Sequence, residues 1–195
     1  MARLTRRDRG LADIVARFGP PPLWSRPRGF PTLLRIILEQ QVSLESARAM
    51  YLRLAATTGK VTPRAVLALG ARGLRRLGFT RQKAGYATEL ARRIEDGSLP
   101  IARLHRLSDE DASALLMGVP GIGPWTAGIY LLMALRRPDI WPRGDLALHK
   151  AMARLDELAR VPSSEEAELI AARWRPLRAV AARILWHGYL SERPT

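Results

Sequence analysis

Two short segments of the chain hold the residue types that could carry out chemistry. In Val119–Ala127, a Gly-x-Gly turn from Gly121 to Gly123 is followed by Pro and Trp. Glycines allow a sharp turn and a close approach of the backbone to a ligand. The helix start predicted after the turn presents backbone N–H groups that can bind an anion. The second segment, Trp141–Leu146, holds a single carboxylate, Asp145. Together the two segments indicate a phosphate contact combined with one acid.

Each segment also has a plainer interpretation. A Gly-x-Gly sequence between two helices can be only a tight turn that joins them. Asp145 can be only the N-cap of a helix predicted over Leu146–Leu155, because Asp is a favoured N-cap residue. Capping and chemistry do not exclude each other, so both interpretations of Asp145 stay open.

The composition favours a polyanionic partner. The 195 residues include 32 Lys and Arg against 18 Asp and Glu, which gives a net charge of +14. Each phosphate that a basic side chain neutralises releases condensed counterions, so this charge favours nucleic acid. A bias toward arginine in the composition would give the same charge and is the alternative explanation.

Several other classes of protein are not indicated. The chain has no cysteine, which excludes disulfides, thiolate nucleophiles and cysteine-ligated metal clusters. Its three histidines, His105, His149 and His187, show no metal-ligand spacing. The N-terminus lacks the apolar core of a signal peptide, and no apolar run approaches the ~20 residues that span a bilayer. We therefore expect a soluble, cytoplasmic protein with no membrane partner.

The elements that position these residues are predicted to be helices. Apolar residues recur at helical spacing along the chain and no alternating strand pattern is present, which predicts an all-α protein of roughly ten helices. The Pro/Gly-rich stretch 19–29 is predicted to be a loop. We expect an N-terminal segment, 1–29, that packs on the C-terminal lobe, then a helical lobe over 30–110, and a lobe over 111–195 that contains the Gly-x-Gly hairpin.

Val119–Ala127, the aspartate Asp145 at this interval and the segment Gln40–Ser43 together resemble the HhH-GPD superfamily of DNA glycosylases. That superfamily is named for a helix–hairpin–helix, a Gly/Pro-rich loop and an aspartate, and the AlkA-type alkylbase glycosylases are the most similar members. Further matching segments are Leu77–Phe79, Gln82–Ala84, Gly97–Pro100 and Trp174–Arg178. The resemblance implies a compact two-lobed helical fold, here without the β-rich N-terminal subdomain of the best-known AlkA type. The hairpin alone also occurs in non-catalytic DNA-binding modules.

The resemblance implies a monofunctional DNA glycosylase of base excision repair. Such an enzyme would hydrolyse the N-glycosidic bond of alkylated bases such as 3-methyladenine, 7-methylguanine or ethenoadenine. Its partner would be double-stranded DNA with a flipped damaged base, and we expect a monomer that needs no cofactor. Bifunctional relatives have a lysine where this chain has Trp125, which implies no lyase activity; Lys150, close to Asp145 in sequence, is the residue that could contradict this. A glycosylase for another damaged or deaminated base and a non-catalytic helix–hairpin–helix protein remain alternatives.

The resemblance also implies roles for single residues. Asp145 is expected to be catalytic, because a carboxylate stabilises the oxocarbenium-like sugar cation of the transition state. Gln41 is expected to insert into the duplex where the flipped nucleotide has left. The residues expected to contact DNA are Gly121, Gly123, Trp125, Thr126, Gln40, Gln41 and Ser43. Those expected to line the base pocket are Trp125, Trp186, Ile129, Tyr130 and Trp24, where Ile129 replaces a tyrosine of relatives. No metal is required, although the hairpin carbonyls could hold a monovalent cation, as in relatives.

Overall fold

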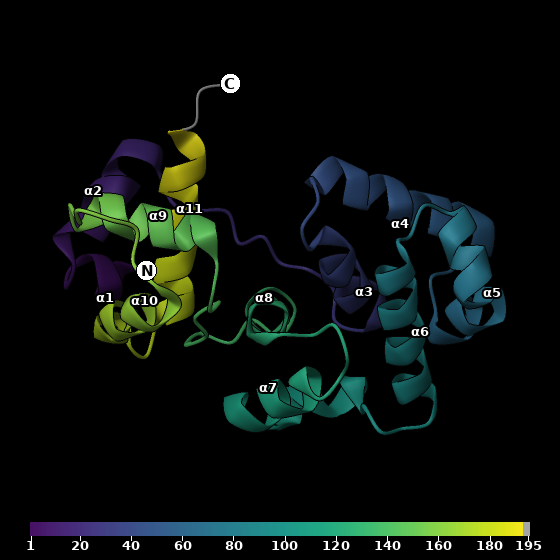
Figure 1. Ribbon diagram of the computed structural model, residues 1–195. Helices are drawn as coiled ribbons and strands as arrows, with labels where there is room; N and C mark the ends of the chain where they lie inside the picture. Colours follow the sequence, from purple (N-terminus) through teal and green to yellow (C-terminus); the bar gives the residue numbers. More distant parts are fainter. Residues whose placement is uncertain (193–195) are drawn as a thin grey trace. The chain divides into compact units, whose positions relative to one another are not determined.

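The structure, a computed structural model, describes residues 1–192, and all regular structure in that range is helical (Figure 1). The α-helices are α1 Ala2–Thr5, α2 Arg9–Phe18, α3 Phe30–Glu39, α4 Leu44–Thr58, α5 Pro63–Arg76, α6 Arg81–Glu95, α7 Asp109–Met117, α8 Pro124–Met133, α9 Leu146–Leu155, α10 Ser164–Ala171 and α11 Arg178–Ser191. Two 3₁₀ helices are η1 Ile101–Arg106 and η2 Ala172–Trp174. The predicted all-α fold is confirmed. Within residues 1–192, none of the helices has the length and apolar character needed to cross a membrane.

Most helices begin at a side chain that caps them. The capping side chain in each case accepts a hydrogen bond from the backbone N–H three residues later, which satisfies one of the N–H groups that the helix leaves unpaired. These N-cap residues are Asp8, Ser43, Thr62, Thr80, Ser108, Asp145 and Ser163. Helices α3 and α8 begin differently, after Gly29 and Gly123, with a proline in the first turn and no side-chain cap.

The chain divides into two compact units. Arg26–Leu135 forms one, called here the central unit, and Met1–Ser25 forms the other together with the chain from Arg136 onward, called the terminal unit. The hairpin lies in the central unit, where α8 packs on α3 as well as on α7. The domain bounds expected from the sequence, 1–29, 30–110 and 111–195, stay a prediction.

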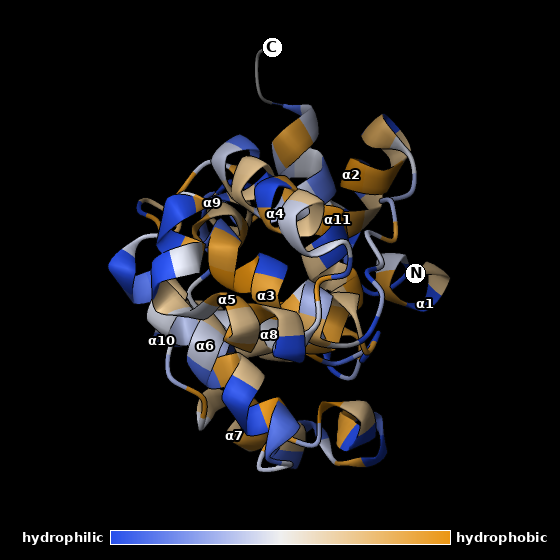
Figure 2. Cartoon of the chain, turned by 90° about the vertical axis from the view of Figure 1, so that its right-hand side faces the viewer, coloured by the Kyte–Doolittle hydropathy of each residue, from blue (hydrophilic) through white to orange (hydrophobic). Residues whose placement is uncertain are grey.

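The central unit is built around α3. Seven of its residues are buried, which follows from a sequence that is apolar on nearly every side. It contacts α4, α6 and α8, and α6 in turn lies beside α5 (Figure 1). Helices α6 and α7 carry both hydrophobic and hydrophilic residues, as Figure 2 shows, which is expected of helices with one buried side.

The terminal unit is built around α11, which packs on α2 and α9. Eight of its residues are buried, among them Trp186. The N-terminal residues are fixed by Asp8, whose Oδ2 accepts a hydrogen bond of 2.6 Å from Trp174 Nε1. Residues at the two ends of the chain therefore share one core.

Candidate functional site

The hairpin between α7 and α8 turns at Gly121 and ends at Gly123. Gly121 has a φ of 87°, which favours glycine, and a Cβ at this position would collide with the ring of Tyr86. Gly123 is exposed, and a Cβ built there would meet nothing within 4 Å. The N-terminus of α8 is thus accessible to a ligand at Gly123. Its first turn is the positive end of the helix dipole, which suits a phosphate oxygen.

Gln40 joins the Gln40–Ser43 segment to this hairpin. Its Nε2 donates to Gly121 O at 2.8 Å and to Thr126 Oγ1 at 2.7 Å. Thr126 is only 2% exposed, so its hydroxyl serves this internal bond. This bond brings together two residues that the sequence predicts to contact DNA. Through Gln40, the hairpin turn is connected to the end of α3.

Gln41 and Ser43 follow on the exposed side of the same segment. Gln41 has a φ of 55°, a left-handed backbone conformation that is uncommon for a glutamine. Its side chain is exposed, as is that of Val42. Ser43 Oγ accepts the N–H of Ser46 at 3.1 Å and so starts α4. The segment thus leaves α3 in a sharp turn, and the predicted inserting residue, Gln41, is among its exposed residues.

Asp145 is the N-cap of α9 and stands at the end of a tight turn. Its N–H donates to Pro142 O at 3.3 Å, and the intervening Gly144 has a φ of 82°. Asp145 Oδ1 accepts two hydrogen bonds, from Leu148 N at 2.9 Å and from Trp186 Nε1 at 3.1 Å. The carboxylate is half-buried. Capping is therefore one of its roles, and the two donors fix the orientation of the whole group.

A second aromatic ring lies beside the indole that bonds Asp145. The ring of Trp24 lies edge-on to Trp186, with centroids 6.3 Å apart and an angle of 79° between planes, and it also lies 6.3 Å from His187. Trp24 has a φ of 45°, so the loop bends sharply at this residue. Two of the predicted pocket residues are thus neighbours next to the predicted catalytic carboxylate, all within the terminal unit.

The other predicted pocket residues lie on α8. Trp125 is half-buried, whereas Ile129 and Tyr130 are 3% and 0% exposed. The hydroxyl of Tyr130 accepts the N–H of Gly29 at 2.9 Å, and burial raises the pKa of this phenol. Tyr130 thereby supports the loop that starts α3. Contact of these three side chains with a base stays a prediction.

Lys83 is a residue of this region whose role the sequence did not reveal. It is 7% exposed and lies on α6, with Nζ 2.7 Å from Leu38 O and 2.9 Å from Gln40 O. Burial lowers the pKa of this ammonium group. In the sequence, Lys83 is noted only as part of the matching segment Gln82–Ala84, and that match does not indicate which groups it contacts.

Metal binding has little support among the residues that can be described. Residues 1–192 contain no group of three or more His, Asp or Glu side chains placed to hold an ion. Of the hairpin carbonyls, Val119 O accepts the N–H of Ile122 and Gly121 O accepts Gln40 Nε2. The monovalent cation expected at these carbonyls stays a prediction.

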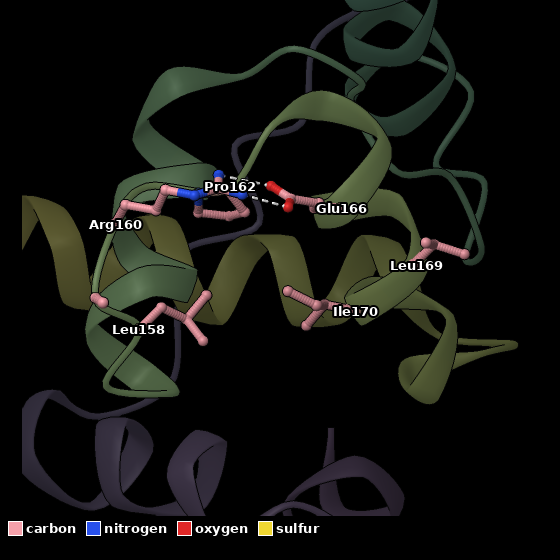
Figure 3. A pocket seen from close by; sticks show the side chains of 7 residues that line it. Leu158, Arg160, Pro162, Glu166, Leu169 and Ile170 are labelled. Carbon is pink, nitrogen blue, oxygen red and sulfur yellow. Dashed lines mark hydrogen bonds and ion pairs between the residues drawn. The ribbon is translucent and has the colours of Figure 1, made fainter.

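A separate hollow of about 390 Å³ lies on the terminal unit and is mainly apolar (Figure 3). It is lined by Leu158, Ala159, Arg160, Pro162, Glu166, Leu169 and Ile170. At its edge Arg160 donates to Glu166 at 2.8 Å. None of the residues predicted to bind DNA or a base lines it, so it is not the site that the sequence indicated.

Several known proteins are similar to this chain in sequence. A putative DNA-3-methyladenine glycosylase of Bacillus subtilis, YfjP, is 29% identical over 186 residues, which are 91% of this chain and 65% of that protein. The DNA-3-methyladenine glycosylase 1 of Schizosaccharomyces pombe is 26% identical over 90% of this chain and 79% of its own length. The chain therefore spans just under two thirds of the Bacillus subtilis relative.

Solved structures agree with these sequence relatives. The Schizosaccharomyces pombe 3-methyladenine DNA glycosylase Mag1 in complex with abasic DNA has a TM-score of 0.80 and 25% identity, covering 91% of this chain and 88% of that one. A DNA-3-methyladenine glycosidase from Bacillus halodurans has a TM-score of 0.82 and 25% identity, covering 95% and 87%. Residues 34–176 match the family model described as HhH-GPD superfamily base excision DNA repair protein. The resemblance drawn from the sequence is confirmed, and the chain belongs to the HhH-GPD superfamily of base excision DNA repair proteins.

Proposed function

We propose that this protein is a monofunctional DNA glycosylase that removes alkylated bases from double-stranded DNA. The observation that carries the proposal is the carboxylate of Asp145, oriented by Leu148 N–H and Trp186 Nε1 next to the Trp24–Trp186 pair. Relatives named as 3-methyladenine glycosylases support the choice of substrate.

The chemistry assigned to Asp145 is stabilisation of a sugar cation. Cleavage of a glycosidic bond passes through an oxocarbenium-like state, and a fixed carboxylate nearby stabilises its positive charge. The same oxygen atoms can orient or deprotonate the attacking water. Bases alkylated at N3 or N7 of a purine already carry positive charge and leave readily, so a second acid is not needed.

The remaining roles follow the same proposal. The N-terminus of α8, after Gly123, binds a backbone phosphate without reading sequence. Gln41 fills the gap in the duplex, and an electron-rich indole, Trp125 or Trp186, stacks on the cationic base. The protein would act on DNA as a cytoplasmic monomer.

We infer the absence of lyase activity from the positions of the lysines. Schiff-base formation with the sugar needs an amine nucleophile. Trp125 occupies the hairpin position at which bifunctional relatives carry lysine. Lys83 Nζ is buried against two carbonyls, and Lys150 lies on α9, five residues after Asp145. Lys150 is therefore the amine that could contradict this assignment, and the borohydride experiment below tests it.

The test is a set of duplexes that each contain one defined lesion: an alkylated purine, ethenoadenine, a deaminated base or an oxidised base. We expect the wild-type protein to release the alkylated bases, with strand breaks visible only after alkali. Release of only a deaminated or an oxidised base would show that the substrate is that base and not an alkylated one. Breaks without alkali, together with trapping of the protein on DNA by borohydride, would contradict the monofunctional assignment. Tight binding with no release from any duplex would indicate a DNA-binding protein that is not an enzyme.

A further inference from the structure

The C-terminus of α3 is held by an ammonium group that comes from another helix. Lys83 on α6 donates to Leu38 O at 2.7 Å and to Gln40 O at 2.9 Å. The last carbonyls of a helix have no partner within the helix, and they form the negative end of its dipole. A buried lysine at this point therefore both satisfies the carbonyls and matches their charge. It acts as a C-terminal cap supplied from outside α3.

The same side of α6 also supports the hairpin. Tyr86, one turn after Lys83, lies against Gly121 so closely that a Cβ on the glycine would collide with its ring. Gln82 Nε2 donates to the Tyr86 hydroxyl at 2.7 Å and restrains this ring. Gln40 then connects the two supported segments, since its side chain bonds Gly121 O while its own carbonyl is bonded by Lys83. Helix α6 is thus a common support for the end of α3 and for the hairpin.

The residue that depends on this arrangement is Gln41. It follows Gln40 directly, is exposed, and has a φ of 55°. Residues with a Cβ rarely adopt the left-handed conformation unless neighbouring groups hold them there. The carbonyl that joins Gln40 to Gln41 is the one fixed by Lys83. Lys83 therefore fixes the carbonyl from which the chain continues to Gln41, while the side chain of Gln40 is fixed by the hairpin.

We propose that Lys83 is a positioning residue, which fixes Gln41 relative to the phosphate-binding hairpin and so controls opening of the duplex at the damaged nucleotide. This rests on the proposed function, in which Gln41 inserts into DNA. Lys83 itself touches neither DNA nor the base. Its loss should leave phosphate contacts intact and impair the step at which Gln41 enters the stack. The competing explanation is that Lys83 only stabilises the central unit.

The experiment compares Lys83→Met with two control variants. Lys60→Met removes one positive charge from an exposed lysine and corrects for weaker attraction to DNA. Leu90→Ala truncates a fully buried residue of the same helix α6 and corrects for lower stability. Insertion is followed by the fluorescence of 2-aminopurine placed opposite a tetrahydrofuran abasic analogue, because unstacking raises its emission. Base release is measured in single turnover with saturating protein, at a temperature at which circular dichroism shows every variant to be folded.

Lys83→Met should lose most of the fluorescence increase and release base about 10- to 100-fold more slowly, since small misplacements of a positioned group cost this much. Its affinity for undamaged duplex should stay within about twofold of Lys60→Met, because both lose the same charge. Leu90→Ala should keep the wild-type fluorescence and rate once folded. A Lys83→Met protein that behaves like Leu90→Ala would overturn the proposal. If Lys83→Met does not fold, Lys83→Gln, which keeps a donor without the charge, takes its place in the same comparison.

Failure of the positioning role is distinguishable from failure of the proposed function. Wild-type protein that releases base while Lys83→Met matches its controls rejects only the role of Lys83. Wild-type protein that releases no base from any alkylated duplex rejects the function, whatever the fluorescence shows.

Discussion

Asp8 and Asp145 are two aspartates of the terminal unit that accept hydrogen bonds from the same two kinds of donor. Each is the N-cap of a helix, and each accepts the N–H three residues later, Leu11 at 3.0 Å and Leu148 at 2.9 Å. Each also accepts an indole N–H, from Trp174 at 2.6 Å and from Trp186 at 3.1 Å. The N-cap role and the indole hydrogen bond therefore do not distinguish Asp8 from Asp145.

The two carboxylates differ in how their oxygens are used. At Asp8 the backbone N–H reaches Oδ1 and the indole reaches Oδ2, and Arg173 Nε lies 3.5 Å from Oδ2 as well. At Asp145 the backbone N–H and the indole both reach Oδ1. The first arrangement closes a carboxylate on both sides and joins the two ends of the chain. In the second, two donors on one oxygen fix the orientation of the carboxylate that we propose to be catalytic.

The largest expected effect is a difference in the rate of base release between variants of these two aspartates. Asp145→Asn should reduce the single-turnover rate of base release by about 10²- to 10⁴-fold, the range typical of a group that assists the reaction directly. Asp8→Asn should keep the rate within about twofold, because Asn also caps helices and Asp8 touches no reacting atom. Equal losses in the two variants would show that both aspartates act only through folding, and circular dichroism serves as the control for folding.

A smaller effect is expected from the two indoles. Trp186→Phe keeps an aromatic ring but removes the donor to Asp145, so base release should slow about tenfold through loss of orientation. Trp174→Phe removes the indole donor from the half-buried carboxylate of Asp8 and should lower stability by about 1 kcal/mol. Denaturant unfolding and single-turnover rates are measured on both. The comparison fails if Trp174→Phe slows catalysis as much as Trp186→Phe does.

The smallest expected effect concerns the ion pair between Asp8 and Arg173. The side chain of Arg173 is 42% exposed, and its NH2 group also lies 2.7 Å from Asp156. Arg173→Met should therefore cost no more than about 1 kcal/mol of stability, an amount that falls as salt is added, as for other exposed pairs. The catalytic rate should not change. A loss of several kcal/mol would mean that this pair, and not the indole, fixes Asp8.

Asp145 and the hairpin were accessible from sequence because their signals are local. Gly121 is required by a left-handed turn, and an aspartate before a helical pattern is a recognisable cap. The all-α fold followed from apolar periodicity in the same way. Such features depend on residues that are close in sequence, so a single sequence is enough to predict them.

The contacts that organise the central unit were not accessible. Contact of Gln40 with DNA stays a prediction, but the bond from its amide to Gly121 O, 81 residues away in sequence, was not expected. Lys83 reaches Leu38 O across 45 residues. The packing of α8 on α3, both in the central unit, is likewise a contact between segments that are distant in sequence. Partners that are distant in sequence leave no periodic or spacing signal, which is why the pattern of residues indicated the segments but not their connections.

The central claim is that Asp145 stabilises positive charge on the sugar, and the affinity for a charged mimic of that state tests it most directly. A duplex with a pyrrolidine abasic analogue, which is protonated, is compared with one that carries the neutral tetrahydrofuran analogue. Wild-type and Asp8→Asn proteins should prefer the cationic duplex by about 10²-fold, as expected for a transition-state mimic. Asp145→Asn should bind the two duplexes equally. A preference that survives in Asp145→Asn would contradict the account.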